Sequence, residues 1–358
     1  MALVLTLMLY CRVGRARRKA ALLGSRSKGG GSTEEDGLAG GVTGSSGELP
    51  SNKLLPSAGS SETDSVTSKN SKLSVDRLHF PRKDLQTVML LGRGDFGDVY
   101  LAKPNGIAED TVLVKALHST EEATQNEFRR QAEMYSKLNH QAVSRIVGMC
   151  AETDPLLVMY EYTDWGDLKQ FLLATRKDVP TAQGCRPPAL TTAQYMGICH
   201  QVALAMEYLS NHRFVHKDLA TRNCLVTSKL DIKISSPSLS KDTYSAEYFH
   251  YRDRLVPLKW APAEAVVEDQ WSSKSDVYAY AVLCWEVFSQ AQMPHEDISN
   301  PDFLYRLEVH EIQWQPPAKS PPAMQDLLRA CWRISAKDRP TFSEVSSQVG
   351  QIFVDTNV

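Results

Sequence analysis

Apolar residues follow a regular pattern only from about Leu85 onward. Alternating apolar and polar positions over residues 88–103 predict two strands around a glycine-rich turn, and residues 111–117 predict a third strand. Apolar positions three or four apart over 123–138 predict a helix, and the continuous apolar run 155–162 predicts a buried strand. The first part of the patterned region is therefore rich in strands.

Helical periodicity dominates the remainder of the chain. The four longest helical patterns cover 167–176, 192–212, 274–289 and 322–334. The proline-rich stretch 179–190 predicts an exposed loop between two of these helices. A strand-rich part followed by a helical part predicts an α+β fold of two lobes, with a cleft where the lobes meet.

The amino-terminal residues have a different character. Residues 1–11 are almost entirely apolar, and seven Lys or Arg with no acid follow between Arg12 and Lys28. The apolar run is shorter than the about 20 residues of a complete spanning helix. Its charge follows rather than precedes it, unlike a signal peptide. A short apolar tail on a translated start is one interpretation, and we favour the inner end of a transmembrane helix with a positive-inside flank.

These patterns divide the chain into segments. Residues 29–72 are rich in Gly, Ser and Thr, as in flexible linkers. We expect the following order: residues 1–11 as the C-terminal part of a transmembrane helix, 12–84 as a basic and then disordered juxtamembrane linker, 85–352 as the folded domain and 353–358 as a short tail. The basic stretch would also attract anionic membrane lipid.

Charge and cysteine content exclude some functions. The net charge of −2 argues against nucleic acid as a partner. Seven cysteines are scattered with no C-x-x-C pair, which fits a reducing compartment and neither zinc nor a disulfide framework.

Several short motifs follow one another in the order found in protein kinases. The run "GRGDFGDV" places Gly92, Gly94, Gly97 and Val99 at G-x-G-x-x-G-x-V spacing, where glycines let the backbone approach phosphates. Lys115 follows in a strand, at the spacing of the lysine that contacts the α- and β-phosphates.

Four more motifs complete this order. The run "HKDLATRN" supplies Asp218 as a candidate base and Asn223 as a candidate metal ligand, and "PLKWAPAEA", "KSDV" and "CWRISAKDRPTF" come after it. The region therefore resembles a tyrosine-kinase domain, with a strand-rich N-lobe and a helical C-lobe. Glu264 with Arg339 match an ion pair that ties the activation segment to the helical lobe.

The runs "FRRQAEMYSKLNH", "GDLKQFL", "LSNHRFVHKDLATRNCLV" and "PSLSKD" make the resemblance finer. They are similar to the colon carcinoma kinase family of receptor pseudokinases, which includes inactive tyrosine-protein kinase 7 and off-track. The resemblance implies a single-pass cell-membrane protein whose cytoplasmic domain acts as a scaffold in Wnt and planar cell polarity signalling and in cell adhesion. It implies intracellular signalling proteins, active kinases among them, and co-receptors as partners.

The sequence departs from an active kinase at its metal site. Ser236, Pro237 and Ser238 replace Asp-Phe-Gly, and a neutral hydroxyl is a poor magnesium ligand beside a carboxylate. Gln131 stands where a Glu should pair with Lys115, and an amide cannot neutralise an ammonium. Glu127, one turn earlier on the same helix face, could substitute, whereas Glu133 points elsewhere.

Other departures concern the cleft and the activation segment. Leu113 stands where tyrosine kinases usually have Ala above the adenine, and Tyr160 falls at the gatekeeper place, so both could fill an empty slot. Three tyrosines of the segment, Tyr244, Tyr248 and Tyr251, are open to two interpretations, as targets of another kinase or as packed or solvated side chains.

Two further matches concern the catalytic loop. His216 and Asp276 match a backbone-bonding pair beneath it. Lys217 stands where kinases have Arg and lacks the fork that grips a phosphate.

Three functions compete on this sequence. The leading hypothesis is a binding module with a degenerate ATP site and no cofactor, in which ATP and magnesium bind weakly or not at all. The first alternative is a weakly active receptor tyrosine kinase that transfers phosphate from ATP to tyrosine, since Asp218, Asn223, Lys115 and the glycines are retained. The second alternative is a nucleotide-binding switch without turnover, which requires an open cleft.

Overall fold

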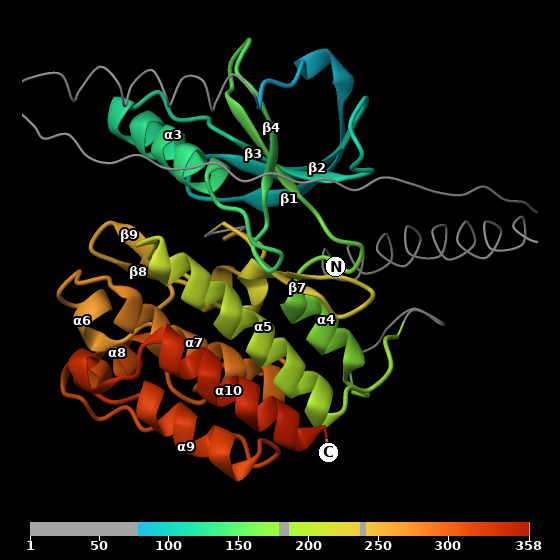
Figure 1. The fold of residues 1–358 in the computed structure, drawn as a ribbon. Helices are drawn as coiled ribbons and strands as arrows, with labels where there is room; N and C mark the ends of the chain where they lie inside the picture. The colour runs from blue at the N-terminus through green and yellow to red at the C-terminus, as the bar shows by residue number, and fades with distance from the viewer. Residues whose placement is uncertain (1–77, 179–185, 237–240, 358) are drawn as a thin grey trace, which may run out of the picture.

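The computed structural model describes residues 78–178, 186–236 and 241–357 (Figure 1). The expected transmembrane end, basic stretch and most of the linker lie outside these residues, as do Pro237 and Ser238. Among the described residues, no helix combines the length and the apolar character needed to cross a membrane.

The N-lobe is built on one five-stranded antiparallel sheet in the order β1-β2-β3-β5-β4. Its strands are β1 (Leu85–Arg93), β2 (Asp98–Pro104), β3 (Val112–Ala116), β4 (Ile146–Cys150) and β5 (Leu157–Glu161). Helix α3 (Glu122–Ser136) places Phe128, Ala132 and Tyr135 in the same core cluster as Leu113 of β3. The strands and helix that the sequence pattern predicts here are confirmed, and β4 is an additional strand that the pattern did not reveal.

The C-lobe is helical and lies below the sheet in Figure 1. Its helices are α4 (Leu168–Thr175), α5 (Thr192–Asn211), α6 (Ala263–Val266), α7 (Ser273–Phe288), α8 (Asn300–Glu308), α9 (Pro322–Cys331) and α10 (Phe342–Thr356). Two strand pairs, β6 (Cys224–Val226) with β7 (Ile232–Ile234) and β8 (Phe249–Tyr251) with β9 (Arg254–Val256), complete the lobe. The predicted α+β fold of two lobes is confirmed.

Local sequence signals set where the long helices begin. Thr191 caps α5, because its hydroxyl accepts a hydrogen bond from the Gln194 backbone N–H and the Gln194 side-chain oxygen accepts one from the Thr191 backbone N–H. Ser272 and Ser275 form the same reciprocal capping box at α7. Helix α7 is mostly apolar and is buried on nearly every face, so it forms the centre of the helical lobe.

Apolar side chains form two layers around the N-lobe sheet. Alternation along β3 sends Leu113 to the inner face, into a core that continues through both lobes. Val112 and Val114 point to the outer face, into a separate cluster that includes Phe80. Phe80 belongs to residues 78–84, which were expected in the linker and instead pack against this sheet.

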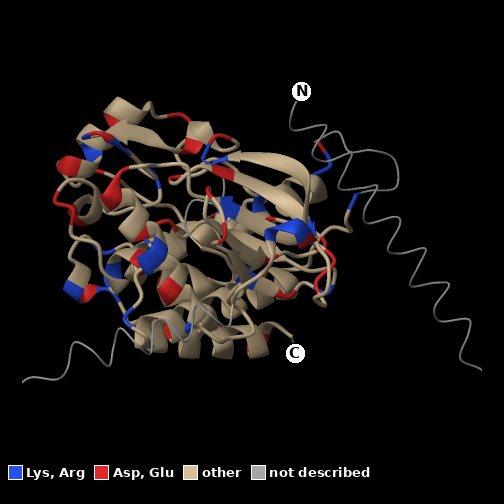
Figure 2. Ribbon diagram, turned by 90° about the horizontal axis from the view of Figure 1, so that it is seen from above, with Lys and Arg blue, Asp and Glu red and all other residues tan. Residues whose placement is uncertain are grey.

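The carboxyl-terminal boundary also differs from the expected one. Helix α10 runs to Thr356, so residues expected in a short tail from position 353 are helical instead. Phe353 accounts for the extension, because its ring lies 5.6 Å from that of His200 on α5 and holds the last turn of α10 against that helix. In the view of Figure 2, Lys and Arg lie interspersed with Asp and Glu along the described ribbon.

Candidate functional site: a closed kinase-like cleft

The glycine-rich turn between β1 and β2 lies close over β3. A side chain at Gly97 would place its Cβ 2.6 Å from the Ala116 carbonyl oxygen, and the Gly97 φ of 151° lies outside the usual range of other residues. Phe96 turns inward, where its ring meets that of Phe128 on α3 at 5.1 Å. The cavity left beneath the turn, bordered by Val99 and Lys115, is about 10 Å³, which is room for about one water molecule.

The activation segment packs against the same turn through residues 241–243. The Arg93 carbonyl accepts hydrogen bonds from the backbone of Lys241 at 2.9 Å and of Asp242 at 3.3 Å. The Asp242 carboxylate in turn accepts the Arg93 N–H at 3.2 Å. Lys241 forms an ion pair with Asp95 at 2.5 Å, and the Thr243 hydroxyl donates to the Leu91 carbonyl. A carboxylate of the chain itself therefore lies against a loop whose amides would otherwise face phosphates.

The position that adenine would take is filled by side chains. Leu113 and Tyr160 lie opposite each other on β3 and β5, and they are 0% and 3% exposed. The expectation that both residues become part of the core is confirmed. Tyr160 also meets Tyr135 of α3 edge to face at 5.9 Å, so its ring closes the rear of the cleft.

Lys115 is buried between the glycine-rich turn and the ring of Tyr160. Its ammonium lies 5.9 Å from the centre of the Tyr160 ring. Burial lowers the pKa of Lys115 to about 8, although the charges of Asp95 and Asp218 act in the opposite direction.

The α3 residues that were candidates to pair with Lys115 have other contacts. Glu127 forms an ion pair with Arg130 at 2.7 Å and accepts a hydrogen bond from the Gln131 amide at 3.0 Å. The Arg130 hydrogen bond holds the pKa of Glu127 below its ordinary value. Gln131 thus faces Glu127, and Glu133 pairs with Lys137 on the exposed side of the helix. These contacts do not support the one-turn substitution by Glu127.

The scaffold beneath the catalytic loop is intact. Asp276 at the start of α7 accepts the backbone N–H of His216 at 2.7 Å and of Lys217 at 3.0 Å, which confirms the expected pair. Lys217 has a φ of 66°, a left-handed conformation that these two bonds maintain. Glu264 and Arg339 form the expected ion pair at 2.6 Å, which is also confirmed.

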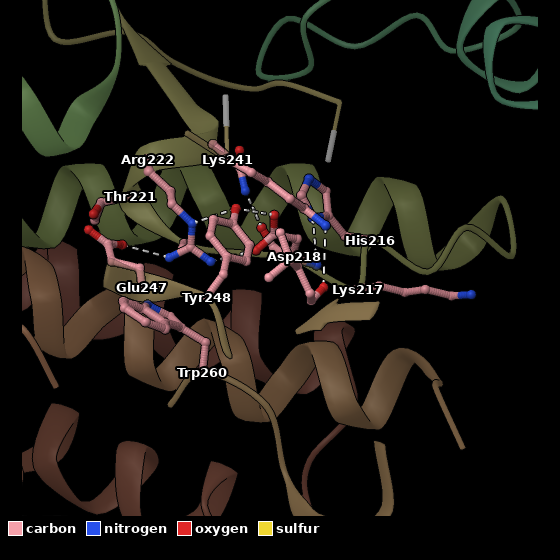
Figure 3. Close-up of polar contacts among 12 residues, drawn as sticks. His216, Lys217, Asp218, Thr221, Arg222, Lys241, Glu247, Tyr248 and Trp260 are labelled. Atoms are coloured by element: carbon pink, nitrogen blue, oxygen red, sulfur yellow. Dashed lines mark hydrogen bonds and ion pairs between the residues drawn. The ribbon is translucent and has the colours of Figure 1, made fainter. Parts of the chain in front are cut away.

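Asp218, at the position of the kinase base, is fully engaged by other side chains (Figure 3). Arg222 holds Oδ1 at 2.5 Å, and the Tyr248 hydroxyl donates to Oδ2 at 2.7 Å. Burial opposes ionisation, but the Arg222 charge and the Tyr248 hydrogen bond keep the pKa of Asp218 below its ordinary value. Tyr248 comes from the activation segment, so the chain places its own tyrosine hydroxyl on the carboxylate that would receive a substrate hydroxyl.

Buried ion pairs fix the segment around Tyr248. Glu247 lies between Arg222 at 2.9 Å and Lys169 of α4 at 2.7 Å. Tyr244 is buried as well, and its hydroxyl donates to Asp167 at 2.7 Å. Of the three tyrosines considered in the sequence, Tyr244 and Tyr248 are therefore packed, whereas Tyr251 on β8 is half-buried.

Asn223 and Ser236 occupy the two positions at which a kinase would hold magnesium. The Asn223 amide donates to the Asp218 carbonyl at 2.7 Å and thereby braces the catalytic loop. Ser236 is 1% exposed, and its position supplies a hydroxyl where magnesium would need a carboxylate. In the three described ranges, no three His, Cys, Asp or Glu side chains come together as a metal site.

A larger cavity of about 600 Å³ lies between α3, the catalytic loop and the β8–β9 hairpin. Gln131, Lys217 and Asp218 contribute to its wall. The cavity reaches the glycine-rich turn at Gly94 and Asp95, whereas neither Leu113 nor Tyr160 lines it.

Sequence reasoning did not find the residues that close the site. Arg222 is four residues after Asp218, and this spacing was a usable signal. Tyr248 and Glu247 carried no such signal, because a segment tyrosine or glutamate can face solvent, another lobe or the catalytic loop equally well.

Comparisons with known proteins agree with this geometry. The family model of protein tyrosine and serine/threonine kinases matches residues 85–349, and the chain belongs to this family. The kinase resemblance expected from the motifs is confirmed.

The chain is similar to a narrower group of proteins within that family. It is 44% identical to inactive tyrosine-protein kinase 7 of Gallus gallus and 43% identical to that of Homo sapiens, in each case over 99% of this chain and 33% of the relative. It is 32% identical to tyrosine-protein kinase-like otk of Drosophila melanogaster, over 98% of this chain and 42% of the relative. The chain thus spans about a third of the length of its relatives named inactive tyrosine-protein kinase 7, and the finer resemblance predicted from the sequence is confirmed.

Proposed function

We propose that this chain is the cytoplasmic pseudokinase part of a single-pass cell-membrane receptor, and that it acts by binding signalling proteins without transferring phosphate. The observation that carries the proposal is the state of Asp218, whose two carboxylate oxygens are held by Arg222 and Tyr248. The name "inactive" of its relatives supports the same view.

The physical argument concerns charge neutralisation. Phosphoryl transfer depends on metal ions that bridge the β- and γ-phosphates and on a carboxylate that receives the substrate hydroxyl. Ser236 removes one magnesium ligand, and a lost ligand costs several kcal/mol of transition-state stabilisation, where each 1.4 kcal/mol is about tenfold in rate. The cavity between Gly97, Val99 and Lys115 is about 10 Å³, which is room for about one water molecule, and this supports weak or absent binding of ATP at that position.

The biological roles in the proposal come from the family resemblance. They are Wnt and planar cell polarity signalling and cell adhesion, with intracellular signalling proteins, active kinases among them, and co-receptors as partners. In cells that lack the receptor, full-length protein carrying Asp218→Asn should restore Wnt reporter output as well as the parent does. If the variant is as abundant and as stable as the parent, a reporter that responds only to the parent would point to catalysis and count against a pure scaffold.

The enzymatic part of the proposal is tested with purified chain. We expect no phosphate transfer from ATP to a tyrosine peptide above background, with magnesium or manganese. Turnover that Asp218→Asn abolishes would establish the weak kinase instead, because a contaminating kinase would not respond to that change.

Nucleotide binding is tested by thermal melting. A ligand at 100 times its Kd stabilises a folded protein by about 2.7 kcal/mol, so even modest binding shifts the melting temperature. We expect little or no shift with millimolar ATP, with or without magnesium. An upward shift of several degrees would favour the nucleotide switch.

A further inference from the structure

Residues 78–84 form a strap across the N-lobe, outside the part of the chain that matches the kinase family. In Figure 1 this first described segment, in blue, begins beside the green strand β4. His79 forms a parallel bridge with Met149, the Phe80 N–H donates to the Met149 carbonyl at 2.8 Å, and the Met149 N–H donates to the Leu78 carbonyl at 2.6 Å. The strap therefore extends the sheet at β4, which is its edge strand.

Phe80 is the apolar anchor of the strap. It is 6% exposed and completes the cluster on the outer face of the sheet, together with side chains from β2, β3, β4 and β5. Gly148 makes room for it, because a Cβ at Gly148 would lie 3.1 Å from the Phe80 Cβ and 3.2 Å from the Met159 sulfur. Backbone pairing with a side-chain pocket at alternate positions is how sheet edges bind extended peptides.

Arg82 is the polar anchor. Its guanidinium donates to the carbonyls of Thr153, at 2.8 Å, and of Pro155 in the β4–β5 turn. Its backbone N–H donates to the Glu152 carboxylate at 3.2 Å. Pro81 has no N–H, so the strand pairing stops there and the chain turns from β4 toward β1.

We propose that the β4 edge and the outer face of the sheet form a binding groove for an extended peptide of the pattern aliphatic-any-aromatic-Pro-Arg. Residues 78–82 are its resident ligand, held in cis. The groove fixes where the upstream chain joins the lobe. A tethered ligand has an effective concentration in the millimolar range, so a separate peptide enters only after the strap is weakened.

The test uses the full chain and a fluorescein-labelled peptide of residues 75–84. We expect the double variant Phe80→Ala/Arg82→Ala to bind this peptide saturably and the parent to bind it at least about tenfold more weakly. A peptide carrying Phe80→Ala should not bind. Lys83→Ala, an exposed residue of the strap, is the matched control and should behave as the parent does.

Hydrogen exchange of the Met149 amide supplies the second readout. It should accelerate in the double variant and slow again when the peptide is added. Equal peptide binding by parent and variant, unchanged exchange in the variant, or fast exchange without binding would each overturn the proposal. If the double variant does not fold, Gly148→Ala alters the groove instead of the ligand, and it should accelerate exchange of the Phe80 and Met149 amides.

Discussion

Leu113 and Tyr160 occupy the part of the cleft in which an active kinase would bind adenine. In an active kinase a small residue at position 113 leaves space for adenine, whereas here the leucine reaches across to Tyr160 on the neighbouring strand. Both side chains are buried in the core that continues through the two lobes. The two residues therefore contribute to the core that joins the two lobes.

This packing predicts the effect of shortening Leu113. Leu113→Ala should lower the free energy of unfolding by about 2–5 kcal/mol, because it removes buried methyl groups and leaves a cavity. Denaturant unfolding measures the change. Leu90→Ala is the control, since Leu90 is 61% exposed on β1 and its loss should be nearly neutral. A neutral Leu113→Ala would mean that the slot is open.

Lys115 gives a prediction with a defined pH range. Its pKa of about 8 is below the ordinary 10.5, so the folded state loses its proton before the unfolded state does. Below pH 8 both states are charged and burial of the ammonium costs stability. Between about 8 and 10.5 the unfolded state binds more protons, so stability rises with pH.

Lys115→Met removes this charge. At pH 7.5 it should raise the free energy of unfolding by about 3 kcal/mol, and this gain should shrink by about 2 kcal/mol at pH 9.5. Denaturant unfolding at several pH values provides the data. Lys103→Met, exposed on β2, should show no such trend. A gain that stays constant with pH would refute the role of burial.

At the scale of elements, three sets of contacts hold the activation segment against the two lobes. Residues 241–243 pair with the end of β1, Glu247 joins α4 to the catalytic loop, and Tyr248 binds Asp218. Each attachment uses a charged or backbone group that would be costly to bury alone. The segment therefore stabilises the lobes while it closes the site.

Tyr248→Phe should weaken the contact between the activation segment and the catalytic loop. The change removes a hydrogen bond to a buried carboxylate, which is worth about 1.5–3 kcal/mol. We expect lower stability and faster hydrogen exchange at the Lys241 and Asp242 amides. Tyr251→Phe serves as the control, because Tyr251 contacts Arg252 through its ring face, which phenylalanine retains. Identical exchange in the two variants would show that the Tyr248 hydroxyl does not hold the segment.

At the scale of the whole molecule, the amino-terminal sequence and the folded lobes predict a tethered domain. The apolar residues 1–11 and the seven basic residues after them should hold the chain at a membrane. Fractionation of a tagged chain with salt and carbonate washes measures this. We expect the protein to resist both washes. Release by salt alone would indicate surface attachment, and full recovery in the soluble fraction would exclude both.

The sequence by itself determined the two lobes, the order of the kinase motifs and the loss of the metal ligand at Ser236. These features depend on local periodicity or on the identity of one residue in a fixed motif, and both can be seen along the chain. The burial of Leu113 could also be predicted, because alternation in a strand indicates the face on which a residue lies. Glu264 with Arg339 and His216 with Asp276 were placed correctly through their motifs.

Only the tertiary structure decided which groups close the site. Tyr248 lies 30 residues from Asp218, and Thr243 lies 152 residues from the Leu91 carbonyl it binds. Such contacts depend on how lobes and loops meet, and the sequence offered many other tyrosines and cations for the same carboxylate. Residues 78–84 illustrate the same limit. Their polar, proline-containing sequence resembles a linker, and they become part of the domain because β4 offers an unpaired edge and Gly148 leaves space for Phe80.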